Sequence, residues 1–522
     1  DCRPMSASTP ISNPLDQAAY PVKNKGLLTL AVMGATIIQI LDSTIANVAI
    51  PLMQTSLGAT MDTITWVLTS YIVASAVAMP ITGWLADRIG SRNLFLGAVA
   101  GFIFASMLCG IATSLTEMVA FRIFQGVCAA FIGPLSQTIM LDINKPSETP
   151  RAMSIWGMGI MIAPILGPMI GGWLTENYNW RWVFYINLPI GIPTLAILWW
   201  LLPSRPINRR ELDRFGFAML AIGLATLQLL LDRGQQEDWL QSWEIIIELL
   251  VVVAALWMFA MHQLTTNRPM FERLLVTDRN FFISLNMMLL VGMMMFGIFA
   301  LLPPMLQNLY GYSVYDTGML LAPRGVGIML AMFIATKLGG KLDPRIIIFS
   351  GFLMTAASMW VMTSWSLNMD WHLIVYTGLF QGFGMGFVFI PLNGVAFSTL
   401  PMRLRTDGSS LLYLFRNLGG SFGISIMTTM FARNMQTSHE DLASHVTPSS
   451  MSAIDPASAD RLGPIGEAAL QMMNLEINRQ AAMIAYLDDF KLMMILLIVI
   501  SPLIFFLKPG TAAPGQQPAM AD

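Results

Sequence analysis

Long apolar segments separated by short polar breaks are the dominant pattern along this chain. A bilayer-spanning helix needs about 20 consecutive, mostly apolar residues, and fourteen segments have roughly that length. They lie at 27–48, 63–85, 93–113, 116–139, 152–174, 182–202, 213–231, 243–263, 280–302, 314–336, 344–364, 372–395, 409–431 and 487–507. We predict that all fourteen are membrane-spanning helices, because a chain that crosses lipid must satisfy its backbone hydrogen bonds internally. The short alternating segments of a membrane β-barrel do not occur in the pattern.

The basic residues lie mainly in every second loop between the apolar segments. One side collects Lys23, Lys25, Arg88, Arg92, Lys145, Arg151, Arg205, Arg209, Arg210, Arg214, Arg268, Arg273, Arg279, Lys337, Lys341, Arg345, Arg403, Arg405 and Lys508. The short breaks on the other side hold little more than Arg181 and Arg233. The positive-inside rule assigns the first side to the cytoplasm. An even number of spans then places both termini there.

An internal repeat divides the spans into two halves. Gln125-Gly126 in the fourth span is followed by residues 132–136 (IGPLS), and Gln381-Gly382 in the twelfth by residues 389–393 (FIPLN). This offset of eight spans predicts two parallel six-helix halves separated by a two-helix insert, an arrangement typical of one large class of transporters. The predicted parts are a tail at 1–26, a first bundle at 27–202, an insert at 203–279, a second bundle at 280–507 and a tail at 508–522.

Composition excludes two classes of protein. Of 522 residues, 55% are hydrophobic and 11% are charged, whereas soluble domains have about 25% charged residues. Mean hydropathy is +0.62. A soluble enzyme is therefore excluded, and a net charge of -2 lacks the basic excess that nucleic-acid binding needs. The three cysteines predict no disulfide framework, and the polar first 25 residues do not form a secretory signal peptide.

Five motifs in order resemble those of a known transporter family. They are residues 41–51 (LDSTIANVAIP), 83–92 (GWLADRIGSR), 121–126 (FRIFQG), 163–172 (APILGPMIGG) and 180–191 (WRWVFYINLPIG). The chain is identified by them as a member of the major facilitator superfamily, similar to the fourteen-span drug/proton antiporters of the EmrB/QacA type. The resemblance implies an all-α inner-membrane protein that exports small lipophilic or amphipathic compounds against protons by alternating access. It also implies a periplasmic adaptor and an outer-membrane channel as partners.

Asp42 and Arg122 are the predicted proton-coupling residues. A charge in the middle of a membrane costs about 2.5–3.5 kcal/mol on insertion scales, so such residues are expected to be functional. Both lie about 10 Å from the exterior ends of their spans, at 1.5 Å per residue, so they meet if the first and fourth spans line one cavity. The alternative is a permanent ion pair that only holds helices together.

Two further arginines, Arg324 and Arg416, lie inside spans without an acid in the same segment. We expect them either to attract an anionic substrate or to tune a distant carboxylate, or else to bond carbonyls freed by adjoining Pro and Gly. The remaining predicted residues of the substrate cavity are Gln39, Trp66, Gln125, Phe131, Gln137, Trp156, Phe387 and Asn393, and Phe389 is a further aromatic residue that would suit it. The 41 methionines suit an adaptable apolar cavity, although ordinary packing explains most of them. Glu248, nearer a span edge, is expected to pack or snorkel.

Two groups of residues are predicted to act in the conformational change. Gly83, Asp87, Arg88, Gly90 and Arg92 belong to the cytoplasmic loop motif, which in the family latches the closed cytoplasmic side. Pro164, Gly167, Pro168, Gly171 and Gly172 belong to the fifth span, where Pro favours a kink and Gly permits close helix contact. The alternatives are a solvated loop and ordinary packing.

No motif supports an enzyme, a cofactor or a metal site, since there is no phosphate-binding loop and no histidine with ligand spacing lies mid-span. Two other functions stay open: a proton-coupled uptake symporter and a non-transporting membrane scaffold. The exterior segment 432–486 is predicted to be flexible around Pro448, Pro456 and Ser449–Ser452. It then becomes an amphipathic helix with Met473, Ile477, Ala481 and Ile484 on one face. This face is covered either by span ends of the same protein, as a lid, or by the membrane surface, or else it contacts the adaptor.

Overall fold

The computed structural model describes residues 18–145, 148–205, 207, 210–338, 341–445 and 464–508, and every regular element within these ranges is a helix. The first half contains α1 (Lys25–Leu57), α2 (Met61–Ile64), α3 (Trp66–Ala78), η1 (Met79–Ile81), α4 (Thr82–Ile89), α5 (Ser91–Ile111), α6 (Leu115–Ile143), α7 (Thr149–Asn177), α8 (Trp182–Tyr185) and α9 (Asn187–Leu201). Then follow α10 (Arg214–Arg233), η3 (Trp239–Gln241), α11 (Trp243–Thr265) and α12 (Arg273–Thr277). The second half contains α13 (Arg279–Asn308), α14 (Val314–Leu338), α15 (Pro344–Met362), α16 (Trp371–Ser398), η4 (Met402–Leu404), α17 (Arg405–Ser444), α19 (Pro464–Ile500) and η5 (Ser501–Phe506).

The predicted all-α membrane fold is confirmed. Thirteen helices of the described chain are long and apolar enough to cross a membrane. The other predicted span, 409–431, lies in α17, which is less apolar because serine, glycine and arginine interrupt its hydrophobic residues. Since α17 packs against α13, α19 and α6, its polar residues lie largely inside the protein.

Several spans are not single regular helices. The predicted span 63–85 is interrupted by the 3-10 turn η1, which contains Pro80. Proline removes a backbone donor and disfavours a continuous α-helix. The predicted span 182–202 is likewise divided into α8 and α9, and the last span ends in the 3-10 turn η5, which contains Pro502.

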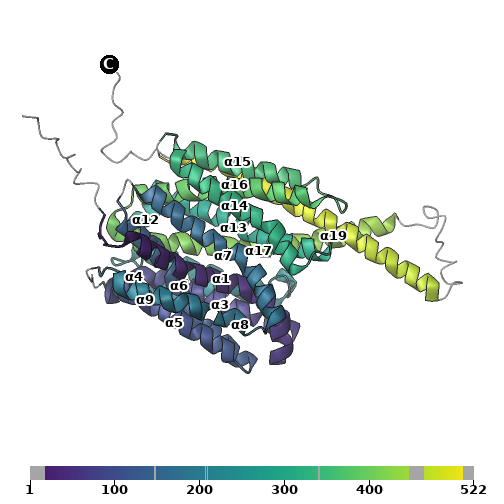
Figure 1. Ribbon diagram of the computed structural model, residues 1–522, viewed down its shortest axis with the longest axis horizontal. Helices are drawn as coiled ribbons and strands as arrows, with labels where there is room; N and C mark the ends of the chain where they lie inside the picture. Colours follow the sequence, from purple (N-terminus) through teal and green to yellow (C-terminus); the bar gives the residue numbers. More distant parts are fainter. Residues whose placement is uncertain are drawn as a thin grey trace, which may run out of the picture.

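The helices form two bundles lying side by side, as Figure 1 shows with the purple and blue first half below the green and yellow second half. In the first bundle α1 packs on α7 and α9, and α6 packs on α3 and α5. In the second bundle α16 packs on α14 and α15, and α13 packs on α17. The contact between the bundles is made mainly by α7 with α14 and by α6 with α17.

The two inserted helices lie against the outside of this interface. α10 packs on α11 and α3, and it also contacts α17 of the second bundle. α11 is covered least of all: only 17% of its most apolar window is buried in the protein. The insert therefore presents one helix to both bundles and the other mainly to the surroundings.

The segment 432–486, which the sequence predicts to be exterior, differs from its prediction at both ends. α17 does not end at residue 431 but continues to Ser444, and α19 begins at Pro464 and runs without a break into the last span. The two extensions support each other, because His439 Nε2 lies 3.1 Å from Asn474 Oδ1. Pro448, Pro456 and Ser449–Ser452 lie outside the described residues. Figure 1 shows α19 in yellow projecting beyond the bundles.

Candidate functional site

An ion pair lies in the middle of the first bundle, between Asp42 of α1 and Arg122 of α6. Arg122 Nη1 donates to Asp42 Oδ2 at 2.6 Å, and both residues are 0% exposed. The structure therefore brings together the two residues that the sequence predicts to lie at the same depth in the membrane. A buried pair of this kind is stable only when other groups satisfy its remaining lone pairs and protons.

Two amides supply this support to Asp42. Gln125 Nε2 donates to Asp42 Oδ1 at 2.8 Å, and Gln125 Oε1 accepts from Arg122 Nη1 at 2.8 Å. Asn187 Nδ2 donates to Asp42 Oδ1 at 2.9 Å and to Ser106 Oγ at 2.9 Å. The carboxylate thus accepts three hydrogen bonds from three side chains, which satisfy the lone pairs that burial removes from water.

Arg122 also contacts α3, whereas its Nη2 atom has no hydrogen-bond partner among the described residues. Its Nε donates to the backbone oxygen of Val67 at 3.0 Å, and its Cζ lies 4.2 Å from the centre of the Tyr71 ring. A guanidinium over an aromatic face is attracted by the ring quadrupole. Because Val67 and Tyr71 belong to α3, the ion pair connects α1, α3 and α6, and Asn187 adds α9.

Asn187 is absent from the residues that the sequence analysis selects. Its signal was available, since it is an amide inside an apolar segment and part of the motif at 180–191. Its position at the first turn of α9, directly after the break at Ile186, aims it at Asp42.

Two polar residues predicted for the substrate cavity, Gln137 and Asn393, lie where the bundles meet. Gln137 Nε2 of α6 donates to Asn393 Oδ1 of α16 at 2.7 Å. On the same helix α6, Thr138 Oγ1 lies 3.2 Å from Ser409 Oγ of α17. These contacts cross the bundle interface, so they must break when the bundles separate there.

The aromatic residues predicted for the cavity are divided between the interface and other surfaces. Trp156 of α7 is fully buried and contacts Tyr413 of α17 edge-on, with 6.3 Å between ring centroids. Phe131 of α6 is 8% exposed. Trp66 is 39% exposed at the start of α3. Phe387 packs toward α15, because its Cβ lies 3.0 Å from where a Cβ on Gly351 would be.

Gln39 and Arg416 are both buried, and each has a polar atom without a partner among the described residues. These atoms are Gln39 Oε1 and Arg416 Nε. The Cζ atom of Arg416 lies 4.3 Å from the Tyr413 ring centre, which places the guanidinium beside an aromatic ring at the bundle interface.

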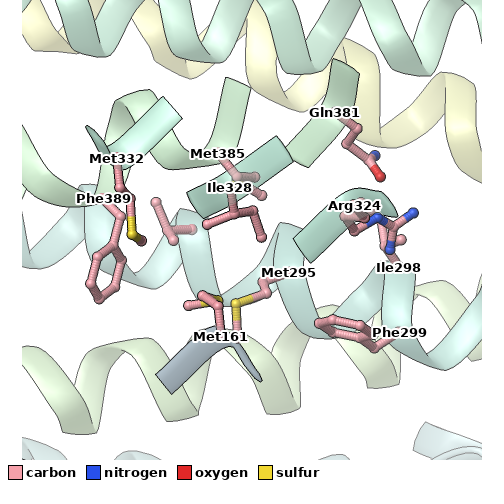
Figure 2. Close-up of a pocket in the computed structure, with 11 residues that line it drawn as sticks. Met161, Met295, Ile298, Phe299, Arg324, Ile328, Met332, Gln381, Met385 and Phe389 are labelled. Carbon is pink, nitrogen blue, oxygen red and sulfur yellow. The ribbon is translucent and has the colours of Figure 1, made fainter. Parts of the chain in front are cut away.

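A separate narrow cavity of about 30 Å³ lies between α7 and the second bundle. Its walls are four methionines, two phenylalanines, three aliphatic residues, Arg324 and Gln381. Figure 2 shows Arg324, Gln381 and Phe299 at one end of this cavity and Met332 and Phe389 at the other. Of the residues predicted for a cavity, Arg324 and Phe389 line it, and its other lining residues were not predicted individually.

The end assigned to the cytoplasm is closed by a three-residue contact, here called the cytoplasmic latch: Asp87, Arg210 and Asp407. Arg210 Nη1 and Nη2 donate to the two carboxylate oxygens of Asp407 at 2.9 and 2.8 Å, and Arg210 Nε lies 3.1 Å from Asp87 Oδ2. Asp87 is on α4 and Asp407 on α17, so Arg210 joins the two bundles. Gly83 permits the approach, since a Cβ there would overlap Asp407.

Arg210 lies in the connection between α9 and α10, outside the spans. Burial lowers the pKa of its guanidinium, but the hydrogen bonds and charge of Asp407, together with Asp87, outweigh burial and the pKa is raised. The latch cation therefore stays charged at physiological pH. A second contact at the same end joins Asp142 of α6 to Arg205 and to Arg405, with Arg405 Nη1 3.3 Å from Asp142 Oδ1.

Arg88 and Arg92 of the loop motif contact other partners. The Cζ of Arg88 lies 5.2 Å from the Trp84 ring centre, and Arg92 Nη2 donates to the backbone oxygen of Trp199 at 2.6 Å. Gly90 has φ +89°, a conformation that favours glycine and lets α4 turn into α5. These residues shape the loop. Of the three charged residues of the loop motif, only Asp87 belongs to the latch.

The glycines of α7 face two neighbours. A Cβ on Gly167 would lie 2.2 Å from Thr44 Oγ1, and one on Gly171 would lie 2.7 Å from Ile45, both on α1. A Cβ on Gly172 would lie 3.3 Å from Val314 of α14. α7 therefore packs closely on α1 and also lies along the other bundle, as small residues at a helix interface permit.

One buried acid was missed by the sequence analysis. Asp489 of α19 is 0% exposed, and neither carboxylate oxygen has a partner among the described residues. The predicted span began at residue 487, which placed this acid at the membrane edge. Glu248 was expected to pack or snorkel, and its Oε1 atom lies 3.7 Å from Arg233 Nη1.

The fold and the site define a class of secondary transporter. A family model described as Major Facilitator Superfamily matches residues 32–424. The chain belongs to the major facilitator superfamily.

The relatives define a narrower group. The chain is 36% identical over 493 residues to "Multidrug export protein EmrB" of Escherichia coli (strain K12), covering 94% of this chain and 96% of that protein. It is 35% identical over 494 residues to "Fatty acid resistance protein FarB" of Neisseria gonorrhoeae, covering 94% and 97%. These similarities confirm the resemblance to drug exporters.

Solved structures support the fold. A human organic anion transporter, MFSD10, has a TM-score of 0.56 at 15% identity, covering 90% of this chain and 99% of that one. A double-tryptophan XylE mutant has a TM-score of 0.58 at 13% identity, covering 94% and 100%. At such identities the likeness concerns the fold alone.

Proposed function

We propose that this chain is a proton-coupled exporter of lipophilic and amphipathic compounds in the bacterial inner membrane, with Asp42 as the proton carrier. The observation that carries the proposal is the fully buried Asp42–Arg122 pair. Relatives named for multidrug export and for fatty acid resistance support the export of such compounds.

The coupling follows from the chemistry of the pair. In this conformation Asp42 has no route to solvent, because both partners of the pair are 0% exposed. When the exterior side opens, water reaches Asp42 and the carboxylate takes up a proton. A neutral carboxyl attracts Arg122 less strongly, so protonation weakens the contact between α1 and α6. Opening toward the cytoplasm releases the proton, and the ion pair forms again.

Substrate moves in the opposite direction through the bundle interface. The cytoplasmic latch is closed in this structure, with Arg210 bonded to Asp407. It must open before a compound from the cytoplasm or inner leaflet can enter. The pairs Gln137–Asn393 and Thr138–Ser409 then separate and expose polar groups to the substrate.

The test uses inside-out vesicles containing the protein, energised to acidify their interior. A lipophilic fluorescent dye should accumulate inside only with a pH gradient, and adding dye should release protons from the vesicles. Dye loss instead of accumulation would identify an uptake symporter. No proton movement on adding any of several chemically different dyes would favour a non-transporting scaffold.

We further propose that the exterior extension of α17 and α19 docks a periplasmic adaptor, which in turn joins an outer-membrane channel. The predicted apolar face is partly covered, since Ala481 is 0% exposed and Met473 and Ile477 are half-buried. The exposed apolar side chains lie beside it: Met472 and Leu475 on α19 are 72% and 67% exposed. Two large apolar side chains on a projecting helix are a typical anchor for a helical partner. The contact between His439 and Asn474 holds the projecting helices together.

Replacing Met472 and Leu475 by serine tests this docking. The double variant should abolish drug resistance of whole cells but retain transport in proteoliposomes. Leu240→Ser is the matched control, since Leu240 is 64% exposed on the connection between the two inserted helices. Unchanged resistance of the double variant would remove the proposed contact, and loss of both activities would assign the segment to transport itself.

A further inference from the structure

The cavity between α7 and the second bundle has one polar end in an otherwise apolar wall. Only Arg324 and Gln381 supply charged or amide groups, whereas Met161, Met295, Met332 and Met385 supply most of the flexible wall. Methionine side chains adapt to ligands of irregular shape. Figure 2 shows the polar groups gathered at the Arg324 end.

Arg324 is a buried cation with an unused bonding edge. It is 6% exposed, and its Nε and Nη2 atoms have no hydrogen-bond partner among the described residues. None of the salt bridges found in the described chain includes it, whereas buried Arg122 has Asp42. An unpaired buried guanidinium is costly, so a counterion or water is needed at this edge.

The geometry of the free edge selects the counterion. Nε and Nη2 are the two donors on one side of the planar guanidinium, and together they match the two oxygens of a carboxylate. Gln381 adds an amide at the same end, whose Oε1 atom also has no partner in the described chain and whose Nε2 atom contacts only Met359 Sδ at 3.5 Å. Rotation of this amide can present Nε2 as a third donor.

The remaining contacts of Arg324 leave this edge free. Its Cζ lies 5.8 Å from the ring centre of Phe299, near the outer limit of a cation–π contact. The preceding Pro323 removes a backbone donor within α14 and so leaves a backbone carbonyl of this helix without its usual partner. Neither Nε nor Nη2 of Arg324 bonds such a carbonyl in the described chain. The alternative from the sequence, hydrogen bonding to carbonyls, is therefore not what occupies these two atoms.

We propose that this cavity is a binding subsite for amphipathic organic anions, in which a carboxylate bonds Arg324 Nε and Nη2 and the apolar part lies along Met295, Met385 and Met332. This inference rests on the proposed export function and names one substrate class for it. Met332 follows Arg324 by eight residues, about 12 Å along α14 at 1.5 Å per residue. The apolar wall is therefore long enough for a chain of several carbons without a second charge. The methionine side chains must move to admit such a chain, because the cavity has a volume of only about 30 Å³ in this conformation.

The test compares three probes with the same apolar chain: dodecanoate, the uncharged alcohol dodecanol and the cation dodecyltrimethylammonium. Binding to purified protein is measured by calorimetry, and export by proteoliposome assays. Arg324→Gln should weaken dodecanoate binding about 10- to 100-fold, the range expected for losing charge-assisted hydrogen bonds. Binding of dodecanol should change less than twofold. Arg324→Lys should recover only part of the affinity, because an ammonium cannot form the two parallel bonds.

Each outcome has a defined meaning. Equal loss for dodecanoate and dodecanol, or unchanged dodecanoate binding, would overturn the subsite. If Arg324→Gln does not fold, Gln381→Leu is measured in its place, and it should weaken dodecanoate about three- to tenfold with dodecanol unchanged; no selective loss overturns the proposal. The proposed function would be contradicted if the wild-type protein exported none of the probes or dyes. The subsite alone would be contradicted if the protein exported the neutral and cationic probes but did not bind dodecanoate.

Discussion

Removing the charge of Asp407 should open the cytoplasmic side. Asp407 accepts two hydrogen bonds from Arg210, at 2.9 and 2.8 Å, and its side chain is 4% exposed against 32% for Arg210. Hydrogen bonds to charged groups contribute about 1.5–3 kcal/mol, and partial exposure of Arg210 reduces the value. Asp407→Asn should therefore destabilise the closed state by about 2 kcal/mol, which is about 30-fold in the ratio of open to closed protein.

The population can be measured by cysteine labelling. Asn393 is 3% exposed at the bundle interface, so a cysteine at this position reacts mainly when the cytoplasmic side is open. The assay uses Asn393→Cys in a background in which Cys2, Cys109 and Cys128 are replaced by serine. A membrane-impermeant maleimide is applied to the cytoplasmic face of inside-out vesicles. Adding Asp407→Asn should raise the labelling rate about 30-fold when opening is fast relative to labelling.

The matched control is Glu211→Gln. Glu211 pairs with Arg268 in the same region, but both side chains are highly exposed, at 78% and 75%, and exposed pairs contribute little. Its labelling rate should stay within about twofold of the parent. A rate for Asp407→Asn that is equally unchanged would refute the assignment of Asp407 and Arg210 as the latch.

Three other outcomes follow from the structure. Gly419→Ala should lower the free energy of unfolding by about 1–3 kcal/mol, because its Cβ would lie 1.9 Å from the backbone oxygen of Leu289. Gly394→Ala is the control and should be neutral, since a Cβ there would have nothing within 4 Å. Equal melting temperatures of the two variants would contradict this packing. The raised pKa of Arg210 means that its contribution to the latch is present at neutral pH and lost only above the ordinary arginine range. Because the thiolate fraction of any cysteine rises with pH, the quantity to compare is the ratio of the labelling rates of Asn393→Cys with and without Asp407→Asn. This ratio should not change between about pH 7.5 and 9, and a fall toward 1 across that interval would contradict the assignment. Arg122→Ala should alter the pH dependence of transport, since Asp42 loses its partner at 2.6 Å; a wild-type pH profile would leave Arg122 only a packing role.

The fold could be predicted from local patterns. Apolar segments of the length of a bilayer fix the spans, and repeated motifs around Gln125 and Gln381 indicate two halves. Asp42 and Arg122 could be selected because a charge inside an apolar segment is costly wherever it lies. Counting residues from the span ends was enough to place them at one depth.

The contacts of the cytoplasmic latch could not be predicted in the same way. Arg210 and Asp407 lie at span ends, where charged residues are common, and only the meeting of the two bundles pairs them. Asp489 was misplaced because α19 begins at Pro464, well before the apolar segment. A helix can extend into water when another helix covers it, and hydropathy alone does not report this.

The central claim is that Asp42 carries the proton. The most direct measurement is substrate-dependent proton movement in proteoliposomes containing wild-type protein or Asp42→Asn, with a pH-sensitive dye inside. Asparagine keeps the size of the side chain but cannot titrate, so the variant should fold and insert normally while coupled proton release falls to the level of empty liposomes. Proton movement by Asp42→Asn at the wild-type rate would contradict the account.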